Sequence, residues 1–299
     1  LNPTLFNSHL LLGTILIKQK KLQEAEVSIR KSIDLNSNLF NSHFLLGTIL
    51  IEQKKLQEAE QPLRKTIQLK PDFAEAHLNL GNLSRHLGNL KEAELSQRKA
   101  IELNPDLAEA HSNLGNILRD LGKLQEAELS LRKAIELNPN FADAYFNLSL
   151  IELLEGDYES GLKNYEFREK RKKGLTIEVK PNIQKFDYTK LEKGEKILIV
   201  SEQGLGDTLQ FMRYIPYLRT LGLDVNFSAQ IKLHPLIQSS GIDSQPLTPV
   251  EASEVSEGTW IPLLSLPRFL KVNPKNPIIT QPYIYSTHEL NQKWKNILS

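Results

Sequence analysis

The first half of the chain repeats itself every 34 residues, and this period constrains the fold more than any other feature. A glycine recurs at this spacing, always after a leucine and twelve residues before a second small residue. The glycines are Gly13, Gly47, Gly81 and Gly115, and Ser149 takes the next place. Such self-similarity is typical of stacked helical units that bury their apolar faces only against their neighbours. Small residues at two fixed places let paired helices approach closely.

Counted from seven residues before each glycine, the units span 6–39, 40–73, 74–107, 108–141 and a worn fifth at 142–175. Their period and fixed residues resemble the tetratricopeptide repeat family. The resemblance implies an α-helical superhelix over residues 1–175, in which the first helix of each unit lines a concave groove. It also implies that the array binds a protein or peptide in that groove.

The later units carry polar residues where the first two carry leucine, threonine and isoleucine. The polar residues are Asn79, Asn113 and Asn147 two places before the glycine position, Asn82 and Asn116 one place after it, and Arg85 and Arg119 four places after it. An asparagine amide offers two donors and an acceptor, so it can pair with the N–H and C=O of a peptide bond. The row resembles the asparagine ladder of O-linked N-acetylglucosamine transferase repeats. Alternatively, these asparagines are polar residues on a solvated face.

A histidine also recurs with the 34-residue period, at His9, His43, His77 and His111. Stacked helices lie ~8–10 Å apart, whereas zinc bonds to histidine measure ~2.0–2.1 Å. Neighbouring rings therefore cannot share an ion, and Tyr145 takes the same place in the fifth unit. We expect a packing position rather than a metal site, and no cofactor.

The composition argues against several classes of partner. Lysine plus arginine number 37 against 36 acidic residues, so no net field favours nucleic acid. The longest apolar stretch, 10–17, is too short to cross a membrane. There are no cysteines, which suits a reducing compartment, and we expect a cytoplasmic protein. Leu1-Asn2-Pro3 looks like the end of an earlier unit, so we expect the chain to begin inside a longer protein.

After the array the pattern changes. Residues 176–195 lack periodicity and predict a linker, and the basic run before them indicates a solvated helix end or, alternatively, a surface for an anion. The short apolar run 197–200 predicts a buried strand. A helical pattern, a second strand at 225–229, a short helix at 231–239 and a third apolar segment at 260–264 follow. Alternating strands and helices predict a parallel α/β sheet over residues 196–299.

The turn after the first strand contains Gly204 and Gly206, but neither the third glycine of a dinucleotide fingerprint nor a Walker lysine. The wider string 202–211, with 262–267 and with 165–168 before the linker, resembles a group of bacterial repeat proteins. In these, a tetratricopeptide array precedes a domain similar to the heptosyltransferases of glycosyltransferase family 9. The resemblance implies that residues 196–299 are the Rossmann-like N-terminal half of a two-domain glycosyltransferase fold, truncated at its C-terminus.

The same resemblance assigns roles to individual residues. It places Glu202, Gln203, Gly204 and Gly206 in an acceptor-binding loop and makes Asp207 the catalytic base. Asp207 could instead cap the following helix. A nucleotide sugar would need the second domain, expected beyond Ser299, so we expect no transferase activity from this chain alone. A third interpretation is an α/β domain retained only as structure.

Overall fold

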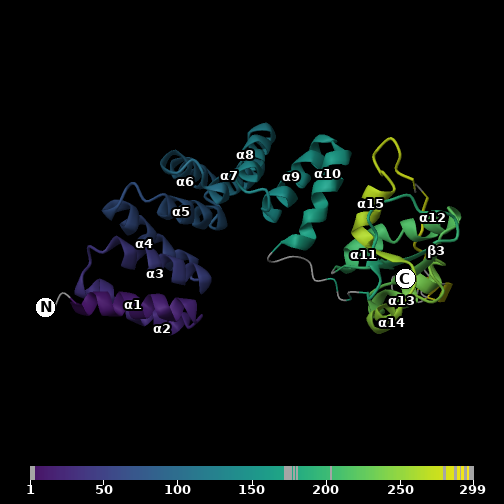
Figure 1. Ribbon diagram of the computed structural model, residues 1–299, viewed down its shortest axis with the longest axis horizontal. Coiled ribbons are helices and arrows are strands. Elements are labelled where there is room, and N and C mark those ends of the chain that lie inside the picture. The colour runs from purple at the N-terminus through teal and green to yellow at the C-terminus, as the bar shows by residue number, and fades with distance from the viewer. Residues whose placement is uncertain are drawn as a thin grey trace. The chain divides into compact units, whose positions relative to one another are not determined.

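The computed structural model describes residues 4–171, 177, 179, 181–202, 204–278, 281–285, 288–289, 291–292 and 295 (Figure 1). It divides into two compact units, Leu1–Ile151 and Glu152–Ser299. The first unit contains paired helices, and the second combines a small parallel sheet with short helices.

The repeats fold as pairs of helices, each comprising a first and a second helix. The pairs are α1 (Thr4–Lys18) with α2 (Leu22–Leu35), α3 (Phe40–Glu52) with α4 (Leu56–Leu69), α5 (Ala74–His86) with α6 (Leu90–Leu103), α7 (Ala108–Asp120) with α8 (Leu124–Leu137), and α9 (Ala142–Glu155) with α10 (Tyr158–Tyr165). Helices α2, α4 and α6 each also pack against the first helix of the next pair. The predicted helical array therefore extends to residue 165, where a 3-10 helix, η1 (Glu166–Lys170), begins.

The periodic glycine is explained by packing within each pair. A Cβ atom at Gly47 would lie 2.8 Å from the fully buried Leu63 of α4, and one at Gly115 would lie 2.6 Å from Leu131 of α8. These separations are shorter than any ordinary carbon–carbon contact, so larger residues would push the paired helices apart. The glycine thus sets the distance between the two helices of a unit.

The periodic histidine has a role in hydrogen bonding as well as packing. The ring nitrogen Nε2 of His43 lies 2.9 Å from the carbonyl oxygen of Ser37. His77 and His111 repeat this contact with the carbonyl six residues earlier, at 3.0 and 2.9 Å. Each ring thus bonds a backbone carbonyl in the loop two residues after the end of the preceding second helix.

Ion pairs connect the second helices along the array. Glu26 contacts Arg30 on its own helix and Lys55 at the start of α4, both at 2.8 Å. Glu94 repeats this arrangement one pair further on, with Arg98 and Lys123 at 2.9 Å. The cations are exposed to solvent, so each pair contributes only about 0.2–1 kcal/mol.

The second unit is built on a four-stranded, all-parallel sheet in the order β1-β4-β2-β3. The strands are β1 (Gln184–Lys185), β2 (Lys196–Val200), β3 (Asp224–Ser228) and β4 (Thr259–Pro262). Helices α11 (Leu205–Phe211) and α12 (Tyr214–Thr220) connect β2 to β3, and η2 (Ile231–Leu233), α13 (His234–Ser239) and α14 (Pro249–Glu254) connect β3 to β4. The chain continues from β4 through η3 (Leu263–Ser265) and α15 (Leu266–Phe269).

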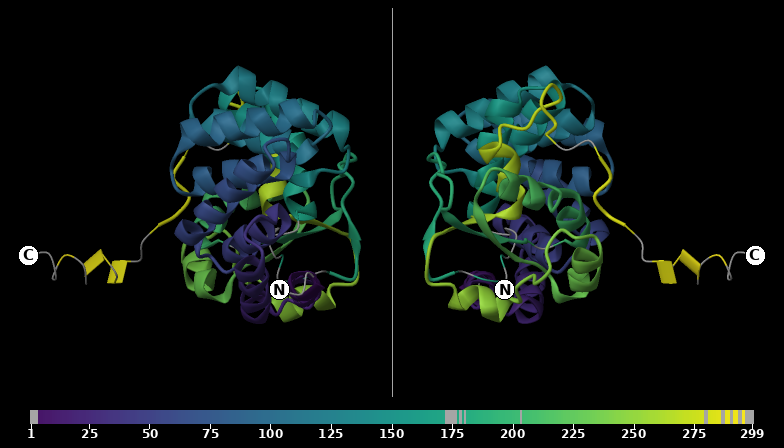
Figure 2. Two further views of the ribbon diagram at one scale, coloured as in Figure 1. Left: turned by 90° about the vertical axis from the view of Figure 1, so that its left-hand side faces the viewer. Right: turned by 90° about the vertical axis from the view of Figure 1, so that its right-hand side faces the viewer.

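Both faces of this sheet are buried. Ile197 and Ile199 of β2 join the larger core with α12 and α13, whereas Leu198 and Val200 belong to a second core, which includes Ala252 of α14. Figure 2 shows the ribbon of the strands and short helices of this unit, coloured green, from two sides. Successive side chains of a strand point to opposite faces, so covering both faces requires a continuous apolar run. The sequence predicts a strand buried on both faces at 197–200, and β2 confirms it.

The boundaries differ from those predicted. The sequence placed the end of the array at residue 175 and a linker at 176–195, but the two units divide between Ile151 and Glu152. Strand β1 also lies inside the predicted linker, where it pairs with β4. A two-residue edge strand leaves no periodic signal in the sequence, and α10 keeps the repeat pattern although it belongs to the second unit.

Candidate functional site

The predicted binding row lies on the first helices α5, α7 and α9, and its asparagines are partly exposed. Asn79 donates a long hydrogen bond of 3.5 Å to the hydroxyl of Thr48 on α3. This contact joins the position two places before the glycine on α5 to the position one place after the glycine on α3. We call the surface formed by Asn79, Asn82, Asn113, Asn116 and Asn147 the asparagine face.

Asn82 and Asn116 occupy equivalent positions but have different surroundings. The Asn82 amide oxygen accepts a hydrogen bond of 3.0 Å from the buried side chain of Gln97 on α6. In the next unit Leu131 replaces Gln97, and the Asn116 amide oxygen is buried with no partner in the described part of the chain. Asn82 is thus held by the array, whereas Asn116 is left with an unsatisfied acceptor.

Asn113 has an unsatisfied donor. Its amide nitrogen is buried and has no hydrogen-bond partner among the described residues. The equivalent nitrogen of Asn79 has Thr48, but the residue in that place before Asn113 is Asn82, whose oxygen already accepts from Gln97. Helix α7 therefore carries one orphaned donor and one orphaned acceptor three residues apart.

The two arginines at the edge of the row converge on one carboxylate. Arg85 reaches Asp120 at 2.6 Å, and Arg119 contacts the other oxygen of the same carboxylate at 3.1 Å. The sequence interpretation treated Arg85 and Arg119 as free to contact a peptide and did not include Asp120. Since two guanidinium groups share one carboxylate, about one net positive charge remains at this edge.

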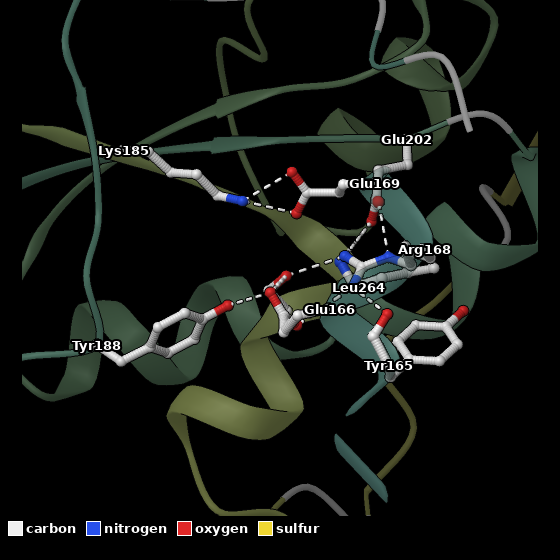
Figure 3. Close-up of polar contacts among 9 residues, drawn as sticks. Tyr165, Glu166, Arg168, Glu169, Lys185, Tyr188, Glu202 and Leu264 are labelled. Atoms are coloured by element: carbon white, nitrogen blue, oxygen red, sulfur yellow. Dashed lines mark hydrogen bonds and ion pairs between the residues drawn. The ribbon is translucent and has the colours of Figure 1, made fainter. Parts of the chain in front are cut away.

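The second unit contains a buried cluster around Arg168 of η1 (Figure 3). The Arg168 guanidinium donates to both carboxylate oxygens of Glu202, from Nε at 2.9 Å and from Nη2 at 3.1 Å. Its other hydrogen bonds reach Ser265 at 2.9 Å, Glu166 at 3.2 Å and the carbonyl of Tyr165 at 3.3 Å. The side chains of Arg168 and Glu202 are 1% and 0% exposed, so the pair is removed from water.

Further hydrogen bonds complete the cluster. Glu202 accepts from the backbone N–H of Leu264 at 3.1 Å, and Glu166 accepts from the hydroxyls of Ser265 and Tyr188. Figure 3 shows these groups converging from η1, the end of β2 and the segment after β4. Residues far apart in the sequence thus meet in one polar cluster within an apolar unit.

Burial and charge act in opposite directions on this cluster. Burial lowers the pKa of the Arg168 guanidinium, but the negative charge and hydrogen bonds of Glu202 outweigh burial and raise that pKa above its ordinary value. Burial raises the pKa of the Glu202 carboxyl, and the Arg168 charge opposes this shift. Burial also raises the pKa of the Tyr188 phenol, and the negative charge of Glu166 raises it further. Arg168 is therefore always charged, and the Tyr188 hydroxyl acts as a donor.

The cluster lies where parallel sheets usually bind ligands. The chain leaves β2 for β3 on one side and returns to β4 on the other, so the direction of winding changes between β2 and β4. Ligands of open α/β sheets bind outside the carboxyl ends of the strands at such a point. Glu202 follows β2 and Ser265 follows β4, and Arg168 occupies the space between them. Glu202, expected to contact an acceptor, instead binds Arg168.

The remaining residues of the predicted acceptor loop have separate positions. Gly204 is the N-cap residue of α11 with a φ of 115°, and a Cβ there would lie 2.7 Å from the carboxylate of Asp207. A Cβ at Gly206 would meet no atom of the described residues within 4 Å, so open space adjoins it in that part of the chain. Gln203 lies outside the described residues.

Asp207 is the third residue of α11 and is partly exposed. It is not the helix N-cap, so that alternative was wrong; Gly204 occupies the position and makes no side-chain cap. Burial raises the pKa of the Tyr165 phenol, and the negative charge of Asp207 contributes to the same shift. The carboxylate is therefore near the Arg168 cluster but not part of its hydrogen-bond network.

Sequence reasoning missed the specific roles of Gln97, Asp120 and Arg168. Gln97 could have been noticed as the one polar residue among Ile29, Leu63 and Leu131 at its repeat position. The strings around Arg168, Glu202 and Ser265 were identified only by resemblance, and no pattern in the sequence indicates that they meet.

The described residues contain no group of histidine, aspartate or glutamate side chains suited to a metal ion. They also include no helix long and apolar enough to cross a membrane.

Comparisons with known proteins concern the array. Sequence profiles described as tetratricopeptide repeat match residues 6–39, 40–73, 74–107, 108–141 and 130–163. No curated protein matches the chain. Similar solved structures include MamA from Desulfovibrio magneticus, which is 16% identical to this chain with a TM-score of 0.51. The match covers 56% of this chain and 97% of that one.

Two further structures have the same fold. A second MamA protein is 22% identical with a TM-score of 0.50, over 57% of this chain and 98% of that one. The pilF protein of Pseudomonas aeruginosa is 19% identical with a TM-score of 0.50, over 55% of this chain and 75% of that one. Together the profile matches run from residue 6 to residue 163, more than half of the chain, so this protein belongs to the tetratricopeptide repeat family.

Proposed function

We propose that the array binds an extended segment of another polypeptide along the asparagine face, mainly through the peptide backbone. Stacked helical repeats curve so that their first helices line the concave side. The asparagines recur once per unit along this side. A row of amides at regular spacing suits an extended chain, whose peptide groups also recur at regular spacing.

The observation that carries this proposal is the pair of unsatisfied atoms on α7, the Asn113 nitrogen and the Asn116 oxygen. A buried polar atom without a partner costs about 1–3 kcal/mol. Both side chains are partly exposed, and the torsion of a terminal amide is broad, so rotation can bring each atom to the surface. A peptide carbonyl and N–H would then supply the missing acceptor and donor.

In this proposal Arg85 and Arg119 are secondary to the asparagines, because Asp120 already pairs with both. The one positive charge that remains can attract an acidic peptide but fixes no backbone position. Asn82 also contributes less to peptide binding than Asn116. To bind a peptide through its amide oxygen, Asn82 would have to give up its hydrogen bond from the buried Gln97 amide nitrogen, which would then keep only the carbonyl of Leu78 as an acceptor.

The test begins with peptides selected from a displayed random library against the whole protein. The tightest peptide is titrated by calorimetry against the parent and against N79A/N113A/N147A. Three lost hydrogen bonds at about 0.5–1.5 kcal/mol each weaken binding roughly tenfold or more. Methylating single peptide nitrogens should weaken binding at specific positions, since backbone groups are recognised. Equal affinities of parent and variant would refute the proposal.

A second candidate function belongs to the α/β unit. We infer that this unit corresponds to the acceptor half of a glycosyltransferase-like protein, with Asp207 as the base that removes a proton from an acceptor hydroxyl. The supporting observation is the partly exposed Asp207 carboxylate near the carboxyl end of β2, with open space beside Gly206. Ligands of parallel sheets bind at that edge. A nucleotide sugar would require a further domain.

Two measurements address this candidate. Saturation-transfer NMR with a panel of nucleotide sugars should show no binding by this chain. A dissociation constant below about 1 mM would contradict the assignment of this unit to the acceptor half. In a protein that carries the donor domain, Asp207→Asn should reduce turnover about 10²–10⁴-fold without lowering the melting temperature. Undiminished turnover would remove Asp207 from the reaction.

A further inference from the structure

At the carboxyl edge of the sheet, acidic and hydroxyl side chains form a site that the Arg168 side chain occupies. Its walls are the carboxylates of Glu202 and Glu166 and the hydroxyl of Ser265, and all three accept hydrogen bonds from one guanidinium. Glu202 and Ser265 are buried, and they follow the two strands between which the winding direction changes. An external ligand would ordinarily enter at this point.

The shape of the site selects a guanidinium group. Arginine carries five N–H donors in a rigid planar fork, and each of the five has an acceptor here. Both oxygens of Glu202 are engaged side by side, which matches the parallel donors of the fork. The ring of Tyr165 lies 4.7 Å from the guanidinium carbon and covers one side. A lysine ammonium has three donors around one point and cannot satisfy this set.

We propose that Glu166, Glu202 and Ser265 form a guanidinium-binding site of the α/β unit and that Arg168 is its resident ligand, occupying the carboxyl edge of the sheet between β2 and β4. This goes beyond the proposed peptide binding and does not depend on it. Although η1 continues the last repeat helix in sequence, it completes the α/β unit. External ligands of this unit must bind elsewhere along the edge, for example beside Gly206, or displace η1.

The proposal is tested by chemical rescue in the full chain. Trp260 in β4 reports on this unit, and Trp294→Phe leaves it as the sole tryptophan. Arg168→Ala should lower the melting temperature read from Trp260 fluorescence by roughly 10 °C, because it leaves buried carboxylates without a partner. Ethylguanidinium at about 10 mM, tenfold above an assumed dissociation constant of about 1 mM, should recover roughly 4 °C.

Three controls separate recognition from general stabilisation. Ethylammonium has the same charge without the fork and should recover nothing. The parent should not respond to ethylguanidinium, because Arg168 fills its site. Adding Glu202→Gln to Arg168→Ala should abolish the recovery. If Arg168→Ala does not fold at all, recovery is read as return of the native Trp260 spectrum on adding ethylguanidinium.

The proposal is overturned if ethylguanidinium and ethylammonium act alike, or if the parent gains as much as the variant. A second variant gives an independent outcome. Arg168→Lys keeps the charge but loses the fork, and it should melt well below the parent. If Arg168→Lys melts with the parent, the site recognises charge alone and no guanidinium specificity exists.

Discussion

Two polar regions of this protein, the asparagine face of the array and the Arg168 cluster of the α/β unit, differ in how their buried groups are satisfied. The array leaves the nitrogen of Asn113 and the oxygen of Asn116 without partners, whereas the α/β unit gives each N–H of the Arg168 guanidinium an acceptor. An unsatisfied group on a face can be stabilised by a partner that supplies the missing bond, and a fully satisfied cluster has no bond left to offer. The comparison contrasts the surface that we propose for peptide binding with a polar cluster whose hydrogen bonds are made within the α/β unit.

The largest effect should come from breaking the satisfied cluster. Glu202→Ala leaves the Arg168 guanidinium buried without its bidentate partner, and we expect a loss of about 3–5 kcal/mol in the free energy of unfolding. Urea denaturation followed by Trp260 fluorescence, in the Trp294→Phe background, measures it.

The matched control is Glu257→Ala, which removes the partner of the exposed Lys196 side chain and should cost less than about 1 kcal/mol. Equal losses for the two variants would show that burial does not distinguish this ion pair from a surface pair.

Apolar packing in the array should give the next largest effect. Leu131 of α8 is 0% exposed, and Leu131→Ala should cost about 2–5 kcal/mol, read as helicity during urea denaturation. Leu129 lies on the same helix and is 69% exposed, so Leu129→Ala should change stability by less than about 0.5 kcal/mol. A similar loss of stability for both variants would contradict the view that burial of Leu131 between the paired helices stabilises the array.

The sharpest form of the comparison lies within the array. Asn82→Ala removes one of the two acceptors of the buried Gln97 amide nitrogen, so we expect a loss of about 1–2 kcal/mol. Asn116→Ala removes an acceptor that has no partner, so stability should stay within about 0.5 kcal/mol of the parent or rise.

Thermal unfolding of the two single variants under identical conditions decides this point. If Asn116→Ala destabilises the array as much as Asn82→Ala, the Asn116 oxygen has a structural partner and the asparagine face loses its principal support.

The smallest effect concerns acid. Burial raises the pKa of the Glu26 and Glu94 carboxyls, but their lysine and arginine partners outweigh burial, so both pKa values lie below the ordinary 4.5. Their contribution to stability is therefore present above pH 4.5 and is lost as the pH falls through the lowered pKa values. The variant E26Q/E94Q should be slightly less stable than the parent at pH 7, and this difference should shrink as the pH falls below 4.5. A difference that persists at low pH would contradict this assignment.

Most of the array could be predicted from the sequence, and the α/β unit only in part. The repeat period located the helix pairs because each unit packs mainly against its neighbours, so the residues at the main packing contacts recur in the sequence. The strand at 197–200 was predicted because burial on both faces requires a continuous apolar run. Strand β1 was missed, since two residues carry no period. The predicted helix after Gly206 is two helices, α11 and α12, interrupted at Met212 and Arg213.

The candidate sites divide in the same way. The sequence by itself determined the asparagine row, because one position per unit repeats at a fixed spacing and a helix face follows from that spacing. Only the tertiary structure decided which asparagines lack partners. Gln97 on α6 bonds Asn82 on α5, whereas Leu131 on α8 offers no hydrogen bond to Asn116 on α7. Only the tertiary structure brought Arg168 to Glu202 and Ser265, because parallel strands joined by crossovers juxtapose residues distant in the chain, and no local pattern records that pairing.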